Sequence, residues 1–513
     1  MKIYDTREIP TDGEGLSANE IYWLYNGFDC CITSEIRHKL RALMDETAFN
    51  TYSRALQMQA PLLEMMLRGT LIDRTHRDRV IKEFTAKLKQ LEEKWARLCC
   101  EGLDLPNPIN WRSPLQVKNL FYGILGIPEI RKRNADGKMM PSTDRETMEK
   151  LRSYFLAEPF ANFVLAMRDI QKGLGFLKTE LDADSRIRCN FNIAGTNTGR
   201  LSSSFSDFGT GTNLQNIDRN LRYIFVPDPG YVFVNIDLEQ ADSRNVGALA
   251  WNMFYESHGP EFAGAYLDAC ESGDLHTQVC RMAWPELDWG DDPDNWRVVA
   301  DQTAYRTYSY RDMAKKLGHG TNYYGQPKTM AGHTKVPVEQ IQTFQSRYFE
   351  AFPCIPAWHD ETIRLLQSTG QLTTLFGRCR SFFNDLRAQS TINAAIAYCP
   401  QSMTGDEINL GMLNLWHDPR FQLLIQVHDS ILLQVEQDAV NELVPLALDM
   451  LQVTIPLVAG REFSVPLEAE VGWNWGKKST ANPLGLSKWK GEETRTPPKR
   501  RNPNKPLTFA DIL

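Results

Sequence analysis

An apolar run that ends in an aspartate restricts the fold of this chain more than any other sequence feature. Residues 231–236, Tyr-Val-Phe-Val-Asn-Ile, are mostly β-branched or aromatic, which predicts a buried strand. The strand runs into Asp237, and a helical pattern then opens at about residue 240. An acid placed where a buried strand gives way to a helix is well positioned to hold a metal ion. The alternative is that Asp237 only caps the helix, since Asp is a favoured N-cap residue.

Composition sets broad limits on the protein. A chain of 513 residues can hold several subdomains, and 42% hydrophobic with 24% charged residues is ordinary for a soluble globular protein. The net charge of −7 does not itself indicate a nucleic-acid binder, although a basic cleft can sit inside an acidic protein. The 10 cysteines include no CxxC pair, so we expect core thiols and no zinc site. Without a signal peptide or a run of about 18 apolar residues, we expect a cytoplasmic location and no membrane contact.

A second acid stands in a predicted β-hairpin. Residues 421–435, FQLLIQVHDSILLQV, place two apolar runs on either side of His428, Asp429 and Ser430, which predicts a hairpin with this triplet at its turn. If Asp237 and Asp429 meet, their oxygens would suit Mg²⁺, which shares such ligands with substrate phosphates. Two ions about 4 Å apart activate an attacking hydroxyl and stabilise a leaving oxygen. His428 would hold a phosphate or the growing end, or it is a structural histidine.

A third stretch, residues 311–325, carries cations and aromatics at a helical spacing. Arg311, Lys315, His319 and Tyr323 follow one another at steps of four, so they share one slowly drifting helix face. The cations would meet a triphosphate, and an aromatic ring roughly 18 Å along the same helix would stack on a base. The alternative is an ordinary cationic surface helix.

Two further regions fit a nucleic-acid partner. The polar, glycine-rich stretch from 190 to 230 carries Arg200, Asn213 and Gln215, which are suited to base edges, although such loops are often only connections. The basic turn at 131–133 is either a phosphate contact or a solvated loop. The region from about 51 to 190 is helical, with one apolar stripe at spacings of three and four that predicts packing: Ile81, Phe84, Leu88, Leu91, Trp95 and Leu98.

Together these motifs resemble DNA polymerase family A, the DNA polymerase I-like group, and especially the replicative enzymes of phages. The resemblance covers most of residues 50–476, and its motifs occur in the family's order. It implies a right-hand polymerase fold of α/β (α+β) class, with an antiparallel palm sheet surrounded by many helices. The motifs are TGRLSS and NLQNI within 198–217, DLEQADSR at 237–244, DLHT at 274–277, RDMAKKLGHGTNYYG at 311–325 and QVHDS at 426–430.

The resemblance also implies a division of the chain. We expect a thumb at 51–190, a palm split between 191–260 and 391–476, fingers at 261–390 and a basic flexible tail at 477–513. The leader, 1–50, contains Tyr25 to Asp29, which resembles the motif that closes the proofreading exonuclease site of DNA polymerases. Asp12, Gly13 and Glu14 give an Asp-x-Glu pattern that would complete such a site, but too little chain lies between this pattern and Tyr25 for a nuclease domain. We therefore expect the leader to be an exonuclease remnant or a docking piece, and the tail to be a second docking piece.

The residue roles that the resemblance implies fall into three groups. Two Mg²⁺ ions, with Mn²⁺ as an alternative, would be held by Asp237, Asp429 and the carbonyl of Leu238, and Lys315 would join the two acids in catalysis. The dNTP would be bound by Arg311, Lys315, His319, Tyr323, His276, Gln240 and Asp242. DNA would be bound by Arg200, Asn213, Gln215, Arg244, Arg378, Gln401 and His428.

Some positions depart from the family pattern. Asp242 stands where the family usually has Glu, the acid that excludes a ribose 2′-hydroxyl, so sugar selection is in doubt. His319 replaces the usual Phe or Tyr. Ser430 replaces the usual Glu, and His-Asp-Ser is the triplet of single-subunit RNA polymerases, which share this fold.

The predicted function is a template-directed DNA polymerase of phage DNA replication, working in the host cytoplasm and without a proofreading nuclease in this chain. The expected partners are primer–template DNA, dNTPs, and a separate exonuclease or processivity factor that uses the leader or the tail. The alternatives are an RNA polymerase of the same fold and a catalytically silent DNA-binding replication subunit.

Overall fold

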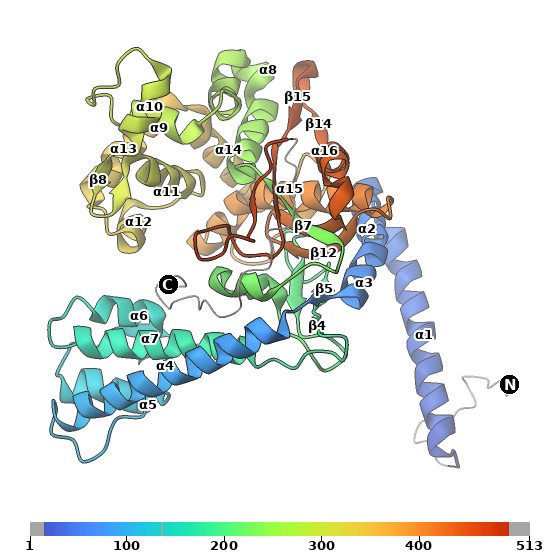
Figure 1. The fold of residues 1–513 in the computed structure, drawn as a ribbon. Helices are drawn as coiled ribbons and strands as arrows, with labels where there is room; N and C mark the ends of the chain where they lie inside the picture. Colours follow the sequence, from blue (N-terminus) through green and yellow to red (C-terminus); the bar gives the residue numbers. More distant parts are fainter. Residues whose placement is uncertain (1–14, 135–136, 492–513) are drawn as a thin grey trace.

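The computed structural model describes residues 15–134 and 137–491, and a five-stranded antiparallel sheet lies at its centre (Figure 1). β7 is the middle strand, with β13 on one side and β16 on the other. The predicted palm sheet is therefore assembled from distant parts of the chain. In order across the sheet the strands are β12 (Gln422–Val427), β13 (Ser430–Glu436), β7 (Tyr231–Leu238), β16 (Leu467–Gly472) and β17 (Ser487–Lys488).

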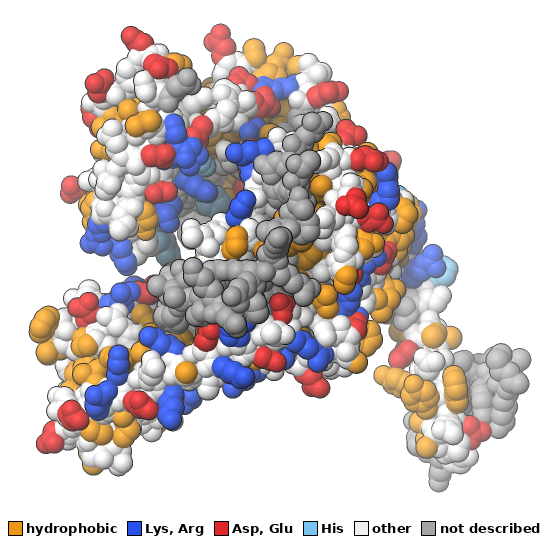
Figure 2. Space-filling model, in the orientation of Figure 1, with side chains coloured by type: hydrophobic (Ala, Val, Ile, Leu, Met, Phe, Trp, Pro, Cys, Tyr) orange, Lys and Arg blue, Asp and Glu red, His pale blue; other side chains and the backbone are white. Residues whose placement is uncertain are grey.

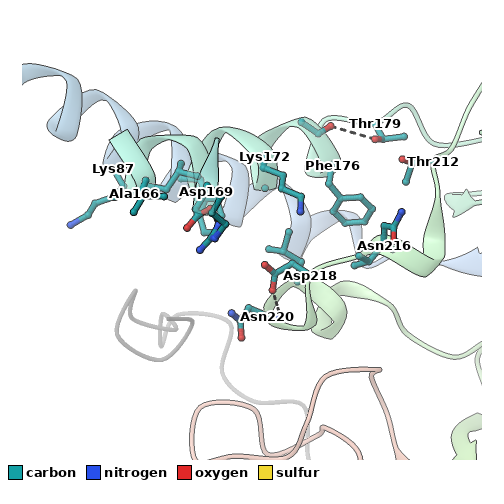
Figure 3. A pocket seen from close by; sticks show the side chains of 18 of the residues that line it. Lys87, Ala166, Asp169, Lys172, Phe176, Thr179, Thr212, Asn216, Asp218 and Asn220 are labelled. Atoms are coloured by element: carbon teal, nitrogen blue, oxygen red, sulfur yellow. Dashed lines mark hydrogen bonds and ion pairs between the residues drawn. The ribbon is translucent and has the colours of Figure 1, made fainter. Parts of the chain in front are cut away.

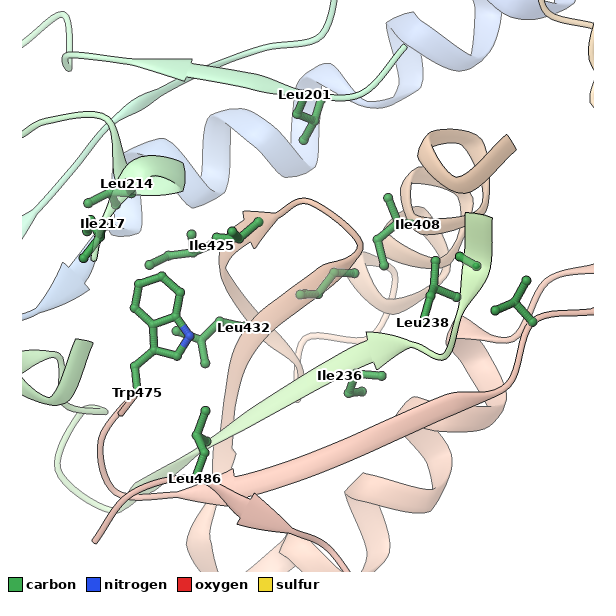
Figure 4. Close-up of a cluster of buried hydrophobic side chains, with 14 of the residues drawn as sticks. Leu201, Leu214, Ile217, Ile236, Leu238, Ile408, Ile425, Leu432, Trp475 and Leu486 are labelled. Atoms are coloured by element: carbon green, nitrogen blue, oxygen red, sulfur yellow. The ribbon is translucent and has the colours of Figure 1, made fainter. Parts of the chain in front are cut away.

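The sheet is buried because consecutive residues of its inner strands are apolar. In β7, Val232, Phe233, Val234 and Ile236 are at most 1% exposed. Figure 4 shows part of the packing, where Ile236, Leu432 and Ile425 from three strands lie with Ile408 of α15 and with Trp475. Helices cover the sheet, among them α15 (Gln389–Trp416) and α16 (Val440–Leu451).

The region predicted as thumb is helical, as expected. α4 (Arg74–Cys100) and α7 (Glu158–Leu177) pack side by side (Figure 1). In the predicted stripe of α4, Phe84, Leu88 and Trp95 are buried, and Ile81, Leu91 and Leu98 pack against them half-buried. The stripe is therefore confirmed as packing.

The basic turn forms a small hairpin of β2 (Arg131–Arg133) and β3 (Met139–Pro141). Lys132 is ion-paired with Asp144 at 2.7 Å and Glu146 at 2.6 Å. This pairing favours the solvated-surface interpretation over phosphate contact.

The predicted fingers begin at a break in a helix. α8 (Ala241–Glu271) leaves the sheet and bends at Gly259, whose φ is 81°, followed by Pro260. The remaining helices of this region form a separate lobe (Figure 1). They are α9 (Leu275–Ala283), α10 (Pro293–Ala300), α11 (Tyr310–Asn322), α12 (Pro327–Thr334), α13 (Val338–Ala351) and α14 (Cys354–Thr369).

The remaining elements complete the described chain. The helices are α1 (Ala18–Leu43), α2 (Glu46–Gln57), α3 (Gln59–Arg68), α5 (Pro114–Lys118), α6 (Arg145–Leu151), the π-helix η1 (Asn119–Ile124) and the 3₁₀ turns η2 (Leu214–Asn216), η3 (Arg219–Ile224), η4 (Gln437–Ala439) and η5 (Val458–Gly460). The strands are β1 (Thr70–Leu71), β4 (Arg186–Ile187), β5 (Asn190–Asn192), β6 (Ser202–Ser204), β8 (Thr303–Tyr305), β9 (Tyr308–Ser309), β10 (Gln371–Thr373), β11 (Cys379–Ser381), β14 (Thr454–Pro456) and β15 (Glu462–Ser464).

Two expectations about the ends and the thiols need correction. The predicted flexible tail begins too early at 477, because β17 pairs with β16 and Leu486 is 3% exposed. An unpaired sheet edge and a buried leucine explain why this part is ordered. Only six of the ten cysteines are buried, while Cys30, Cys31 and Cys379 are exposed. The basic, proline-rich stretch and the apolar end of the tail lie outside the described residues, as do Asp12, Gly13 and Glu14 of the leader.

Within the described residues, no helix combines the length and the apolar character needed to cross a membrane.

Candidate active site

The two predicted metal-binding acids meet where the middle strand of the sheet, β7, ends and the β12–β13 hairpin turns. Asp237 pairs with Ser430 across β7 and β13, and Asp429 is the preceding residue in the hairpin turn. The backbone N–H of Leu238 donates to the carbonyl oxygen of Asp429 at 3.1 Å. The β12–β13 hairpin closes by pairing Val427 with Ser430, so His428 and Asp429 form its turn, as predicted. Residues 192 positions apart in the sequence are thereby neighbours.

The position of Asp237 makes its carboxyl costly to ionise. Partial desolvation, followed by the negative charge of Asp429, raises the pKa of Asp237 to about 7. Glu468 and Glu470 of β16 add to this effect, and Lys477 opposes it. Asp237 is nevertheless an exposed residue, so its carboxyl remains open to ions from solution. This combination of crowded acids and open access fits a cation site.

The groups that could bind a metal ion here include the two carboxylates of Asp237 and Asp429. Among the described residues, no group of three or more His, Cys, Asp or Glu side chains is arranged to hold a metal. Two carboxylates with a nearby carbonyl suit Mg²⁺, which keeps several waters and shares ligands with substrate phosphates. These residues therefore fit an open site for a hard ion such as Mg²⁺, which keeps several waters, and not a site in which the protein supplies every ligand.

The turn after β7 carries Gln240, and Asp242 follows it in the chain. Gln240 has a left-handed backbone, with φ 56°, and directly precedes α8. Its buried side-chain oxygen has no hydrogen-bond partner in the described structure. Asp242 lies in the first turn of α8 and accepts hydrogen bonds from Arg200 Nη2 and Thr404 Oγ1, each at 3.0 Å. A strained residue with an unsatisfied polar atom is typical of a functional turn.

The face of α11 predicted to bind a nucleotide reaches Asp242. The His319 and Tyr323 rings have centroids 4.8 Å apart. Burial and then the negative charge of Asp242 raise the pKa of Tyr323, and its buried hydroxyl has no hydrogen-bond partner that meets full geometry. Desolvation lowers the pKa of His319, with Asp242 opposing this and Lys315 adding to it. The predicted fingers helix and the palm therefore form one polar cluster, which also includes Gln401 beside Tyr323.

The cations of the same face differ in their pairing. Arg311 donates to both oxygens of Asp274, the N-cap residue of α9, at 3.0 and 2.9 Å. Desolvation and the charges of Arg311 and Lys315 lower the pKa of His276 to about 4, so this histidine is neutral near pH 7. Lys315 is exposed and forms no ion pair within the described part of the chain. Lys315 is therefore the cation best able to meet an incoming anion.

The residues predicted to bind DNA are placed in different ways. Asn213 caps η2 and donates to the carbonyl of Ser203 at 2.6 Å, so it holds the loop. Gln215 donates to the side chain of Gln426 at 3.0 Å, which ties the same loop to the β12–β13 hairpin. His428 is exposed at the hairpin tip, with φ 57°.

The predicted arginines are mostly engaged within the protein. Arg244 is 6% exposed and donates to the carbonyl of Glu239 at 3.1 Å, so it supports the strand–helix turn rather than a surface. Arg378 forms an ion pair with buried Asp406 at 2.6 Å and lies against Gly199. A Cβ at Gly199 would come within 2.6 Å of the Arg378 guanidinium carbon, and φ is +76° there, so this position requires glycine.

A cavity of about 1090 Å³ opens away from the carboxylates, between the predicted thumb and the loop that carries Asn213 (Figure 3). Asn213, Asn216 and Lys172 are among its lining residues, but neither Asp237 nor any residue of α11 is. Figure 2 shows lysine and arginine side chains gathered around the hollow between the upper lobe and the predicted thumb.

Sequence reasoning missed a buried polar network behind Asp242. Asn245 bonds Thr404 at 3.1 Å and Glu407 at 3.3 Å, and all three are buried. Burial raises the pKa of Glu407 to about 8. The only signal was polar residues inside an otherwise apolar helix, which does not by itself indicate a partner.

Comparisons with known proteins identify the family of this chain. The sequence profile of DNA polymerase family A matches residues 74–282 and 293–477. The chain belongs to DNA polymerase family A. The family A chain is 28% identical over 469 residues to "DNA polymerase I, thermostable" of Thermus thermophilus, covering 84% of the chain and 50% of that relative. It is 24% identical over 504 residues to DNA polymerase I of Deinococcus radiodurans, covering 92% of the chain and 46% of that relative.

The chain thus spans about half the length of the curated relatives that it matches. A solved structure described as "POL domain of Pol1 from M. smegmatis complex with DNA primer-template and dNTP" has a TM-score of 0.65 at 23% identity. The match covers 82% of this chain and 70% of that one, and supports the predicted fold class.

Proposed function

We propose that this family A chain is a template-directed DNA polymerase that adds dNTPs to a primer 3′ end. The observation that carries the proposal is the adjacency of Asp237 and Asp429 where β7 ends. The helix α11, which bears Lys315, approaches Asp242 of the same region through His319 and Tyr323. Relatives of the chain named DNA polymerase I, and a similar structure described with primer-template DNA and dNTP, support the substrate class.

Asp237, Asp429 and the carbonyl of Leu238 are the proposed ligands of two Mg²⁺ ions, with Mn²⁺ as an alternative. Such ions, when bound, lower the pKa of the attacking hydroxyl and stabilise charge on the leaving oxygen. The chain's own residues orient the reactants. The primer 3′-hydroxyl attacks the α-phosphate of the dNTP, and pyrophosphate leaves.

The cation face neutralises the departing group. Lys315 contacts the triphosphate directly, while Arg311 reaches it by exchanging its bond to Asp274 for one to a phosphate. His276 is neutral and donates a hydrogen bond rather than a charge. His319 and Tyr323 line the base and sugar, and Gln240 and Asp242 face the sugar.

The duplex side of the proposal uses the loop from Arg200 to Gln215. The cavity lined by Asn213 and Lys172 is the proposed place of the minor-groove face of the duplex. Arg200, Gln401 and His428 are the proposed contacts nearer the primer end. Arg244 and Arg378 act on DNA through the loops that they hold.

Asp237→Ala tests the central assignment. We expect primer extension to fall by at least about 10³, since the site loses a metal ligand, while duplex binding in a gel-shift assay stays within about twofold. Asp449→Ala, at an exposed aspartate of α16, is the matched control and should leave both unchanged. Extension by Asp237→Ala near the control rate would reject the proposal.

A second candidate is an RNA polymerase of the same fold, because Ser430 follows His428 and Asp429. The Ser430 hydroxyl donates to the carbonyl of Val427 at 3.0 Å, so the hairpin itself accounts for a serine there. Primed template offered with only dNTPs or only rNTPs separates the two activities. Extension that requires rNTPs would favour the second candidate.

The wider setting is part of the same proposal. We infer a role in phage DNA replication in the host cytoplasm. We also expect no excision by this chain, and loss of label from a 3′-labelled primer would detect such excision. A separate exonuclease or processivity factor stays a predicted partner. The remaining alternative is a catalytically silent DNA-binding subunit, and any metal-dependent extension would exclude it.

A further inference from the structure

Helix α1 (Ala18–Leu43) is the part of the described chain with the least packing. None of its 26 residues is buried, and Figure 1 shows it extending away from the rest of the molecule. Helices in proteins owe most of their stability to the packing of an apolar face. A long helix without such packing therefore points to a partner surface.

Six exposed apolar side chains of α1 form one stripe, while the exposed Trp23 lies on the opposite face of the helix. At 100° per residue they fall within an arc of about 120°. All six side chains are exposed, from 37% for Phe28 to 82% for Leu43. Two charges, Asp29 and Lys39, lie within this arc, and Lys39 also forms an exposed ion pair with Glu35 of the same helix at 2.8 Å. The stripe consists of Tyr25, Phe28, Ile32, Ile36, Leu40 and Leu43.

We propose that this stripe binds the same stripe of a second copy of the chain, as an antiparallel helix pair. One register, with the twofold axis crossing at Ser34, makes every element of the stripe complementary. It places Tyr25 opposite Leu43, Phe28 opposite Leu40, and Ile32 opposite Ile36 of the second copy. The same register sets Asp29 of each copy opposite Lys39 of the other, so the pair contains two opposite-charge contacts.

The alternative orientation does not work. A parallel pair would set Asp29 beside Asp29 and Lys39 beside Lys39, which repels at both positions. It would also bring both molecular bodies to the same end of the pair, because the body follows α1 at its C-terminal end (Figure 1). The antiparallel pair separates the bodies.

The expected size of the interface sets its strength. Each copy contributes six large side chains over residues 25–43, and buried aromatic side chains remove about 150–250 Å² each from water. The pair then reaches the lower end of the roughly 1,200–2,000 Å² typical of stable specific interfaces. The dimer should therefore be reversible and concentration-dependent.

Sedimentation velocity of the full chain over a wide concentration range tests the proposal. The wild type should shift from one to two copies per particle, and Ile32→Asp should remain monomeric. Asp29→Lys and Lys39→Asp should each weaken dimerisation by about tenfold or more, since each sets like charges opposite one another. Arg37→Asp makes a comparable charge change off the stripe, and its dimerisation should match wild type.

Mixing the two charge variants is the decisive step. Asp29→Lys and Lys39→Asp chains restore both opposite-charge contacts when they pair with each other, so an equimolar mixture should dimerise within about threefold of wild type. A wild type that is monomeric at every concentration overturns the proposal, including one whose stripe instead binds a separate protein. A mixture no better than the single variants overturns it as well. Primer extension by all variants should equal wild type, because α1 lies apart from Asp237.

Discussion

The acidic and cationic ends of the candidate site balance their charges in opposite ways. The acidic end is formed by Asp237 and Asp429, where β7 ends. Asp237 has no dominant cation beside it there, and its pKa rises to about 7. At α11, Asp274 is bonded to Arg311 through both oxygens, and the pKa of that carboxyl falls well below its usual range. The carboxyls of the acidic end therefore lack a dominant compensating cation within the protein. At the cationic end, the positive charge of Arg311 is already compensated by Asp274.

This difference indicates what each end requires from a ligand. The acids gain most from cations delivered from solution. On the cationic face, Lys315 is ready to bind an anion, but Arg311 must first give up Asp274. A raised carboxyl pKa alone does not identify a binding site, because Glu407 also has one and is sealed inside the protein.

Among the variants that test this difference, removing Lys315 should give the largest effect. Lys315→Ala should lower the single-turnover rate of primer extension by about 10²–10³, the range for one preorganised charged group. Lys316→Ala is the matched control, because Lys316 also lies on α11 but has its ammonium 5.0 Å from the Tyr308 ring. If both variants extend primers equally well, the contrast between the two ends is lost.

Glu407 tests whether a raised carboxyl pKa by itself indicates a ligand-binding site. The folded protein keeps a proton on Glu407 up to about pH 8, whereas the unfolded chain releases it near pH 4.3. The folded state thus binds more protons between these values, and the free energy of unfolding falls as pH rises through this window. Glu407→Gln should remove this loss, on the order of 2–3 kcal/mol between about pH 6 and pH 8.

Urea unfolding at the two pH values measures this difference. Glu339→Gln, at an exposed glutamate in the first turn of α13, should keep the wild-type pH dependence. Added Mg²⁺ should not change the Glu407 contribution, in contrast to Asp237. A wild-type slope retained in Glu407→Gln would assign the pH dependence to other groups.

The sequence predicted the elements whose pattern is local. The apolar run of β7, the hairpin around His428 and the stripe of α4 each follow from periodicity, and each is present. The pairing of Asp237 with the hairpin came from the family resemblance, because no local pattern sets the order β13-β7-β16. The start of the flexible tail was misplaced because pairing of β17 depends on an edge formed elsewhere in the chain.

Partners of polar residues were the least predictable part of the site. The sequence identified Arg311 as a cation but not its bond to Asp274, and Arg244 as a DNA contact although it is buried. The Thr404–Asn245–Glu407 network was also missed. Such contacts depend on how helices cross in space, and residue type alone does not encode that crossing.

Asp242 lies between the two ends, and its support should have the smallest effect. The Thr404 hydroxyl lies 3.0 Å from Asp242 Oδ1, so Thr404→Val removes one of its two hydrogen bonds but keeps the side-chain shape. We expect the ratio of kcat/KM for dNTP over rNTP to fall by about 2- to 10-fold, the worth of one hydrogen bond. Thr391→Val, at a buried threonine in the first turn of α15, should leave the ratio unchanged. An unchanged ratio in Thr404→Val would mean that Arg200 alone positions Asp242. Sugar selection would then depend on Asp242 and Arg200, and not on α15, which carries Thr404.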